Sequence, residues 1–211
     1  MSKVKIQGNA SGTGTLTISA PNTNTDRSLT LPDGAGEILL SDGDGSNLTG
    51  ITQGITEIDM FYLASGVSLT SSDGTNALTG TWTRFGTKIG TGMSVSGGFW
   101  TFPSTGKWMI DFTANWYADS SITSRILINY IHTTTNNTNY SEANRGATYL
   151  RAFSSNTWTQ ANARVTFNVS DTSTHKVLLY AENAGTSDSI TLYGGTDKNT
   201  NVIFTRLGDA E

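Results

Sequence analysis

The sequence predicts an all-β protein, with a sandwich or jelly roll of about ten antiparallel strands in residues 60–211. Composition is the first reason: charged residues are only 14% of the chain and Gly is 23 of 211 residues. Thr, Ser and Asn fill much of the remainder, which favours strands and turns. Periodicity is the second reason, because apolar and polar residues alternate in the longest segments and no stretch has a helical period.

The alternation is clearest in residues 107–117, and it indicates strands with one face in a core. The apolar positions there are Trp108, Ile110, Phe112, Ala114 and Trp116. In residues 160–169 they are Ala161, Ala163, Val165, Phe167 and Val169. The other expected strands are Met60–Leu69, Trp82–Ile89, Ser94–Phe102, Arg125–Ile131, Ala147–Phe153, His175–Ala181, Ser189–Tyr193 and Val202–Leu207.

The aromatic residues divide the chain into two parts. All the Phe, Tyr and Trp residues lie after position 60, and the first is Phe61. Residues 1–59 hold the excess of acidic over basic side chains that gives the net charge of −4. Because aromatic rings dominate core burial, we expect a self-sufficient head at 60–211 and an arm at 1–59 without a core of its own.

The arm contains three short apolar patches separated by turn signals. Their apolar residues are Leu16, Ile18, Leu29, Leu31, Ile38 and Leu39. Isolated strands of this length are marginally stable. We therefore expect the arm to order by pairing with other copies of the chain or by docking onto a larger particle. A disordered linker is the alternative.

The segment 99–112 carries a family resemblance. It reads Phe-Trp-Thr-Phe-Pro-Ser-Thr-Gly-Lys-Trp-Met-Ile-Asp-Phe, so that an aromatic strand, a Pro-x-x-Gly turn and an alternating aromatic strand follow one another. This resembles the signature of C1q/TNF-like jelly rolls, and residues 189–207 resemble the end of such a domain. The resemblance covers residues 60–208. It implies a ten-stranded sandwich, a last strand beside the first near the axis of a homotrimer, and binding of partners without catalysis.

The arm has a resemblance of its own. Gly12–Gly36 and Asp42–Ile51 are similar to segments of structural proteins of tailed bacteriophages. Together the two resemblances imply a virion appendage, either a capsid decoration or head fibre or a short tail fibre. Residues 1–59 would then bind capsid or tail proteins. The alternative is the receptor-recognition head of a tail fibre that binds host glycans.

The expected location is the virion, after assembly in the bacterial cytoplasm. The chain has no cysteine, and Met1–Lys5 is not followed by an apolar signal core. No apolar run is long enough to insert in a membrane. The net charge of −4 argues against a nucleic-acid partner.

No catalytic, cofactor or metal site is expected, and hence no enzyme. The only two histidines, His132 and His175, have neither an HExxH motif nor a cysteine pair around them. Asp42–Asn47 starts like a calcium loop but has Asn47 where the EF-hand needs Gly. A glycosidase would need paired acids, and Asp111 and Glu182 lie nearest to strong strands, but solvated faces explain both.

Three aromatic residues are candidates for contact with a ligand. Tyr117, Tyr140 and Trp158 fall at expected strand ends or in loops. Amphipathic rings at such places can stack on sugar faces and are common at binding hot spots. The alternative is that they pack in the trimer seam or in the core.

Overall fold

The structure is a computed structural model, and it describes residues 11–15, 17, 22–26, 54–118, 122–152 and 156–211. The chain divides into two units, residues 1–49 and 50–211. In the first unit the described residues are exposed. The amide of Thr25 there donates a hydrogen bond to Oγ1 of Thr23 over 3.1 Å. The arm residues Leu16, Ile18, Leu29, Leu31, Ile38 and Leu39, and the segment Asp42–Asn47, lie outside the described residues.

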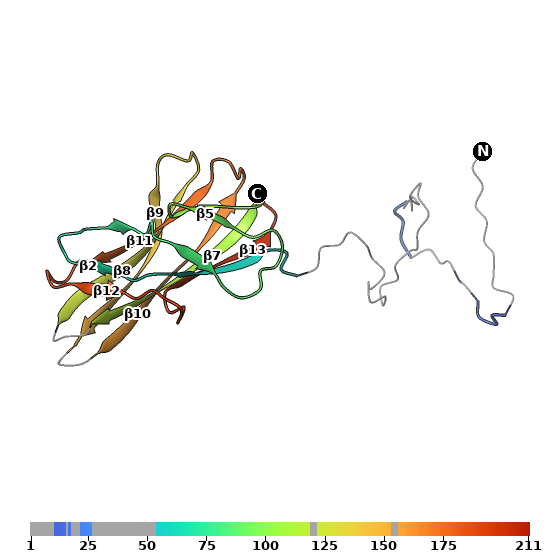
Figure 1. Ribbon diagram of the computed structural model, residues 1–211. Coiled ribbons are helices and arrows are strands. Elements are labelled where there is room, and N and C mark those ends of the chain that lie inside the picture. The colour runs from blue at the N-terminus through green and yellow to red at the C-terminus, as the bar shows by residue number, and fades with distance from the viewer. Residues whose placement is uncertain (1–10, 16, 18–21, 27–53, 119–121, 153–155) are drawn as a thin grey trace. The chain divides into compact units, whose positions relative to one another are not determined.

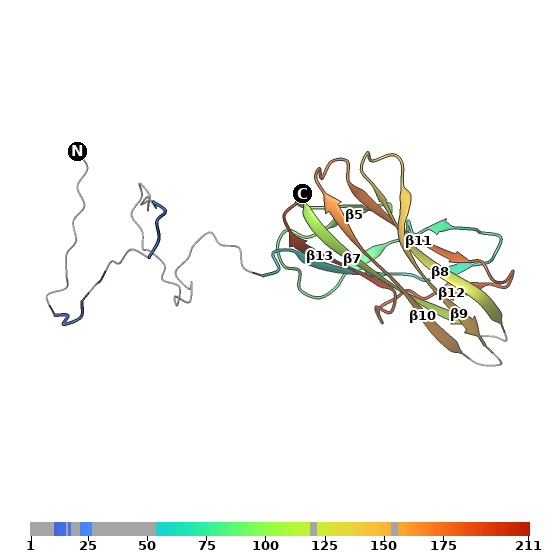
Figure 2. The same cartoon turned by 180° about the vertical axis from the view of Figure 1, so that it is seen from behind.

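The second unit is a sandwich of two antiparallel sheets, seen from opposite sides in Figures 1 and 2. Sheet A consists of β1 (Ile58–Leu63), β2 (Val67–Leu69), β4 (Trp82–Arg84), β7 (Gly106–Ala118), β10 (Thr157–Val169), β12 (Ile190–Leu192) and β13 (Asn201–Gly208). Their order is β2-β12-β7-β13-β1-β4. β12 and β13 pair with successive parts of one edge of β7, and β10 pairs with its opposite edge. The first and last strands of the head are therefore neighbours, as the C1q/TNF resemblance implies.

Sheet B consists of β3 (Asn76–Ala77), β5 (Ser94–Ser96), β6 (Phe99–Thr101), β8 (Thr123–Thr134), β9 (Ser141–Arg151) and β11 (Lys176–Asn183). Their order is β5-β6-β11-β8-β9, and β3 pairs with β11. The described residues of the head contain strands, turns and bends and no helix. The predicted all-β jelly roll is confirmed.

Burial follows the predicted alternation along the two longest strands of sheet A. β7 and β10 pair over their full lengths, from Ala118 with Thr157 to Gly106 with Val169. Every second residue of β7 is buried, as the pattern at 107–117 requires. Since opposite residues of an antiparallel pair share a face, the register sends the apolar sets of both strands into one core.

Trp100 lies at the centre of that core. Its fully buried ring packs 4.8 Å from Phe61, 4.9 Å from Phe204 and 5.6 Å from Trp82, measured between ring centroids. Trp100 belongs to β6 of sheet B, whereas its three neighbours belong to β1, β13 and β4 of sheet A. This aromatic cluster therefore joins the two sheets.

Thirteen strands are described where about ten were expected, because two expected strands are divided and the two-residue β3 was not expected. Met60–Leu69 separates into β1 and β2, and Ser94–Phe102 folds into the β5–β6 hairpin. The turn of this hairpin is Gly97–Gly98, and both residues have positive φ. A Cβ on Gly98 would lie 2.7 Å from the carbonyl oxygen of Leu78, so the turn also requires a residue without a side chain.

The edges of the two sheets meet where β9 lies against β10. Side chains join these strands: Asn144 Nδ2 donates to the carbonyl of Arg164 over 2.6 Å, and the hydroxyls of Thr148 and Thr159 lie 2.8 Å apart. A Cβ on Gly146 would fall 2.1 Å from the carbonyl oxygen of Asn162. Gly146 therefore permits the close approach that closes this side of the sandwich.

We expect Phe204→Ala to lower the free energy of unfolding by about 3–5 kcal/mol, because it removes a ring from the fully buried cluster. Phe99→Ala is the matched control, since that ring is 45% exposed. Its loss should stay below about 1 kcal/mol. Urea unfolding at one fixed chain concentration measures both values. Equal losses would contradict the assignment of Phe204 to the core that joins the sheets.

Candidate functional site

Two of the three candidate aromatic residues come together on the outer face of sheet A. Trp158 of β10 is the register partner of Tyr117 of β7, and their ring centroids are 4.5 Å apart. Tyr193, just after β12, completes the cluster at 4.5 Å from Trp158 and 6.0 Å from Tyr117. We call Tyr117, Trp158 and Tyr193 the three-ring cluster. Trp158 is 45% exposed, so the cluster is accessible on the single chain.

Local hydrogen bonds fix Tyr193 in the cluster. Its amide donates to the carbonyl of Asn115 over 2.7 Å, and its hydroxyl donates to Oδ2 of Asp197 over 3.1 Å. The bond to Asp197 raises the pKa of the Tyr193 hydroxyl above its ordinary value. No sequence pattern marks Tyr193, because a backbone hydrogen bond from the segment after β12 to Asn115 of β7 brings it to the other rings.

Apolar side chains continue across the outer face of sheet A. Met60 of β1 pairs in register with Ile203 of β13, which pairs with Asp111 of β7. Tyr62 and Met109 lie on the same face in neighbouring rows of the ladder. The side chains of Met60, Tyr62, Met109 and Ile203 are half-buried. Polar side chains share this face, because Asp111 accepts hydrogen bonds from Asn162 and Arg164 beside the apolar set. The four apolar residues are therefore a patch on a mixed face, as is common at protein interfaces.

Tyr140 lies apart from the three-ring cluster, near sheet B. Its ring centroid is 5.7 Å from that of Phe99, which is exposed. Burial raises the pKa of the Tyr140 hydroxyl, and nearby Tyr180 adds to the shift. The structure therefore separates Tyr140 from Tyr117 and Trp158.

Further rings extend from Tyr140 across the outer face of sheet B. Val177, Leu179 and Ala181 of β11 point into the core, so Tyr180 lies on the outer face. The ring of His132 lies 4.3 Å from that of Tyr180 and 5.9 Å from that of Tyr130. We call the set Phe99, Tyr140, Tyr180, His132 and Tyr130 the sheet B strip.

Charged groups flank the sheet B strip. The Tyr130 hydroxyl donates to Oε2 of Glu182 over 2.5 Å, and Arg145 Nε lies 3.7 Å from Oε1 of Glu142. Burial, with a contribution from Glu182, raises the pKa of Tyr130 to about 12. Burial lowers the pKa of His132, and Glu142 offsets part of that shift. Near neutral pH the strip therefore presents a phenol and a neutral imidazole.

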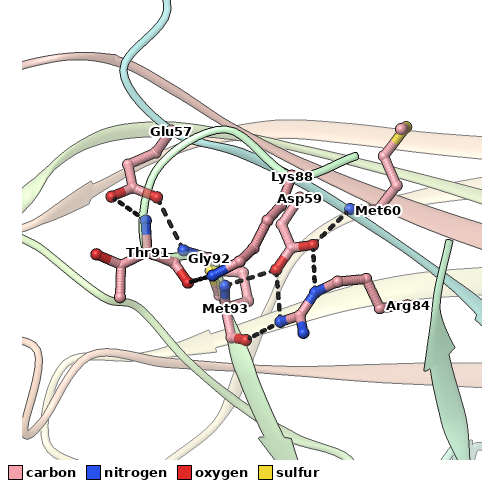
Figure 3. Close-up of polar contacts among 8 residues, drawn as sticks. All are labelled: Glu57, Asp59, Met60, Arg84, Lys88, Thr91, Gly92 and Met93. Carbon is pink, nitrogen blue, oxygen red and sulfur yellow. Dashed lines mark hydrogen bonds and ion pairs between the residues drawn. The ribbon is translucent and has the colours of Figure 1, made fainter. Parts of the chain in front are cut away.

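A carboxylate cluster holds the start of the head, as Figure 3 shows. Glu57 accepts hydrogen bonds from the amides of Thr91 and Gly92, both over 3.0 Å. Asp59 accepts from the amide of Met93 over 2.8 Å and from Nε and Nη2 of Arg84 over 2.8 and 3.0 Å. Two side chains of one segment thus bind three consecutive amides of the loop before β5.

A glycine allows the loop to approach this closely. Gly90 has φ of +75°, and a Cβ there would lie 2.4 Å from the Glu57 carboxyl group. Both acids fall within residues 1–59, but the structure places them in the second unit because β1 begins at Ile58. No sequence motif marks this contact, which joins residues more than thirty positions apart.

The groups considered for catalysis do not assemble into a site. Asp111 lies on sheet A and Glu182 on the outer face of sheet B, so the two acids cannot act as a pair. His175 is buried rather than at the surface, with its ring nitrogens 3.0 Å from Thr174 Oγ1 and 3.3 Å from Ser170 Oγ. Within residues 11–211 as far as they are described, no three His, Cys, Asp or Glu side chains gather to hold a metal ion. The described segments also include no helix long and apolar enough to cross a membrane.

The comparisons with known proteins support the fold. No family model matches the sequence, and no curated protein matches it. Among solved structures, murine APRIL at pH 5.0 matches with a TM-score of 0.51 and 10% identity, over 72% of this chain and 98% of that one. Eiger TNF from S. frugiperda matches with a TM-score of 0.51 and 12% identity, over 73% of this chain and 94% of that one. The head is therefore a TNF-like jelly roll.

We expect Asp59→Asn to lower the free energy of unfolding by about 3 kcal/mol, because it leaves Arg84 and the Met93 amide facing a neutral side chain. Asp59 is only 1% exposed. Asp209→Asn is the matched control, since its exposed carboxylate also pairs with an arginine, Arg206. That change should cause little measurable loss. Urea unfolding compares the two, and a loss no larger for Asp59→Asn would contradict the role of the cluster.

The free energy of unfolding should fall less in His132→Gln than in the wild type as the pH is lowered from about 7.5 to about 5.5. Because the pKa of His132 is lowered in the folded state, the unfolded chain binds the proton first as pH falls. The contribution of His132 to stability is fully present above the pKa of the unfolded chain. It is lost as the pH falls through the lower pKa of the folded state. Tyr130, Tyr180 and Glu142 face the ring. Equal pH dependence of urea unfolding in both proteins would contradict this.

Proposed function

We propose that the protein is a non-enzymatic structural protein of a bacteriophage virion. In this account the jelly-roll head forms a homotrimeric surface appendage, either a capsid decoration or head fibre or a short tail fibre. Residues 1–59 anchor it to capsid or tail proteins. The protein is then assembled in the bacterial cytoplasm and resides in the virion.

The apolar patch on the outer face of sheet A is the feature that most directly supports the proposal. Met60, Tyr62, Met109 and Ile203 occupy neighbouring ladder positions, and the three-ring cluster lies on the same face. Such a surface favours burial against another protein. A second copy of the chain is the partner that the C1q/TNF resemblance of 99–112 implies.

Two unlike parts of the outer face of sheet A support closure into a ring of three. A cyclic trimer joins two different patches of each chain, whereas a two-fold dimer joins identical ones. The set Met60, Tyr62, Met109 and Ile203 is one such patch, and the three-ring cluster is the other.

The virion assignment is supported by the arm. Its residue order at Gly12–Gly36 and Asp42–Ile51 is similar to that of phage structural proteins. An anchored trimer would also give the arm the partner strands that its short apolar patches lack. Three arms on one assembly would bind a particle with avidity that a single arm does not have.

Host-glycan recognition by the head is the alternative function. The sheet B strip favours it, because that strip lies on the sheet opposite to the proposed association face. On this account the trimer seam covers Tyr117 and Trp158, and Tyr140 remains the predicted aromatic residue that faces a ligand.

We expect Ile203→Glu to shift the full chain from trimer to monomer at micromolar concentration, because it places a charge in the proposed seam. Ser94→Glu is the control, since that residue is exposed on β5 of the other sheet. Multi-angle light scattering during size-exclusion chromatography measures the mass. A trimer that persists in Ile203→Glu would contradict the assigned face.

We expect deletion of residues 1–55 to leave a folded head that no longer joins particles. The deletion retains Glu57 and Asp59 and thus the carboxylate cluster. Circular dichroism reports on folding, and immunoblotting of purified virions reports on incorporation. A truncated protein that still joins particles would count against the anchoring role of the arm.

A further inference from the structure

We propose that the sheet B strip binds a neutral oligosaccharide built of hexopyranose rings. The proposal rests on the glycan-recognition alternative above, and it adds the position of the site and the class of sugar. The site consists of the rings of Phe99, Tyr180 and His132, with Glu182 beside them.

The rings form a continuous surface because neighbouring strands place them in register. Phe99 of β6 and His132 of β8 both pair with Leu178 of β11. Leu178 is buried although it faces outward, so the adjacent side chains cover it. Tyr180 lies two residues further along β11 and packs against His132.

The dimensions of the strip suit a short sugar chain. β6, β11 and β8 are consecutive strands, so the strip crosses two ladder spacings, about 10 Å in all. That length accommodates a short oligosaccharide. The C–H faces of a pyranose are apolar and its edges are hydroxylated. Aromatic rings bind such a ligand on their faces and leave its hydroxyls to polar groups.

Glu182 supplies an acceptor for those hydroxyls. The hydroxyls of Tyr130 and Thr75 both donate to Oε2 of Glu182, over 2.5 and 3.0 Å. A carboxylate offers about four acceptor positions, so Glu182 keeps capacity for a ligand while two bonds hold it in place. A pre-positioned acceptor lowers the entropy lost on binding.

The charges of the strip favour a neutral sugar. Its flanking ionised groups are Glu142, Glu182, Arg145 and Lys176, a balance of two acids to two bases. Lys176 lies two residues before Leu178 on the same face of β11. Arg145 lies 3.7 Å from Glu142, so its charge is partly neutralised. His132 is neutral near pH 7, because burial lowers its pKa. A carboxylated sugar would therefore gain no net electrostatic attraction here.

The test uses the full chain and isothermal titration calorimetry. The probes are linear oligosaccharides of glucose, of mannose and of galactose, with an oligogalacturonate as the acidic counterpart. We expect at least one neutral probe to bind. Tyr180→Ala and Phe99→Ala should each raise the dissociation constant per chain by about tenfold. Glu182→Gln should also weaken it while preserving the shape of the side chain.

Trp158→Ala is the matched control, because it removes an exposed ring from the three-ring cluster on the other sheet. Its per-chain dissociation constant should equal that of the wild type. Light scattering on the same samples reports the oligomeric state separately. A monomer that still binds the sugar through Tyr180 would contradict the proposed trimer but not the proposed sugar site on the sheet B strip.

Three results would overturn the proposal. The first is that no neutral probe binds the folded chain. The second is that only the acidic probe binds. The third is that binding survives both ring removals on sheet B but is lost in Trp158→Ala, which would move the site to sheet A. Circular dichroism melting of each variant separates loss of binding from loss of folding.

Discussion

The packing of Trp100 against three rings of the opposite sheet is the contact on which the rest of the head depends. Each sheet alone has an apolar inner face that water would destabilise. Trp100 of β6 joins the two inner faces by packing against Phe61, Trp82 and Phe204 of sheet A. Once the inner faces are joined, the alternation along every strand decides what lies outside. The two outer faces are therefore consequences of the core.

These outer faces differ in chemistry. Sheet A carries an aliphatic patch of Met60, Met109 and Ile203 beside the ion pair of Asp111 with Arg164, whereas sheet B carries rings interleaved with Glu142, Arg145 and Glu182. An aliphatic patch gains most from contact with protein, and a face of rings and charges suits an amphipathic ligand. This difference is the reason for assigning association to sheet A and recognition to sheet B.

The fold was predictable because its signals are local. The alternation at 107–117 and 160–169 gave the strands and their buried faces, and the segment 99–112 gave the family of jelly rolls. The positive φ at Gly98 and the close approach of Gly146 explain turns and seams that alternation alone does not reveal.

The sites were only partly predictable, because they are made by contacts distant in sequence. Tyr117 and Trp158 were identifiable as strand-end rings, but their contact depends on the β7–β10 register, and Tyr193 joins through a backbone bond to Asn115. From the sequence, Glu57 and Asp59 belong to the acidic arm. Their structural role depends on hydrogen bonds from the amides of Thr91–Met93, which are distant in sequence. Composition and residue spacing do not reveal contacts between residues that are distant in the sequence.

Thiol labelling reports whether the assembly covers the outer face of sheet A, since the chain has no cysteine of its own. Trp158 and Phe99 are each 45% exposed on the single chain, one on sheet A and one on sheet B. Trp158→Cys and Phe99→Cys would be labelled with a maleimide in the full chain at micromolar concentration. The account predicts at least about tenfold slower labelling at position 158, because the assembly covers sheet A. Equal labelling rates at the two positions would contradict it.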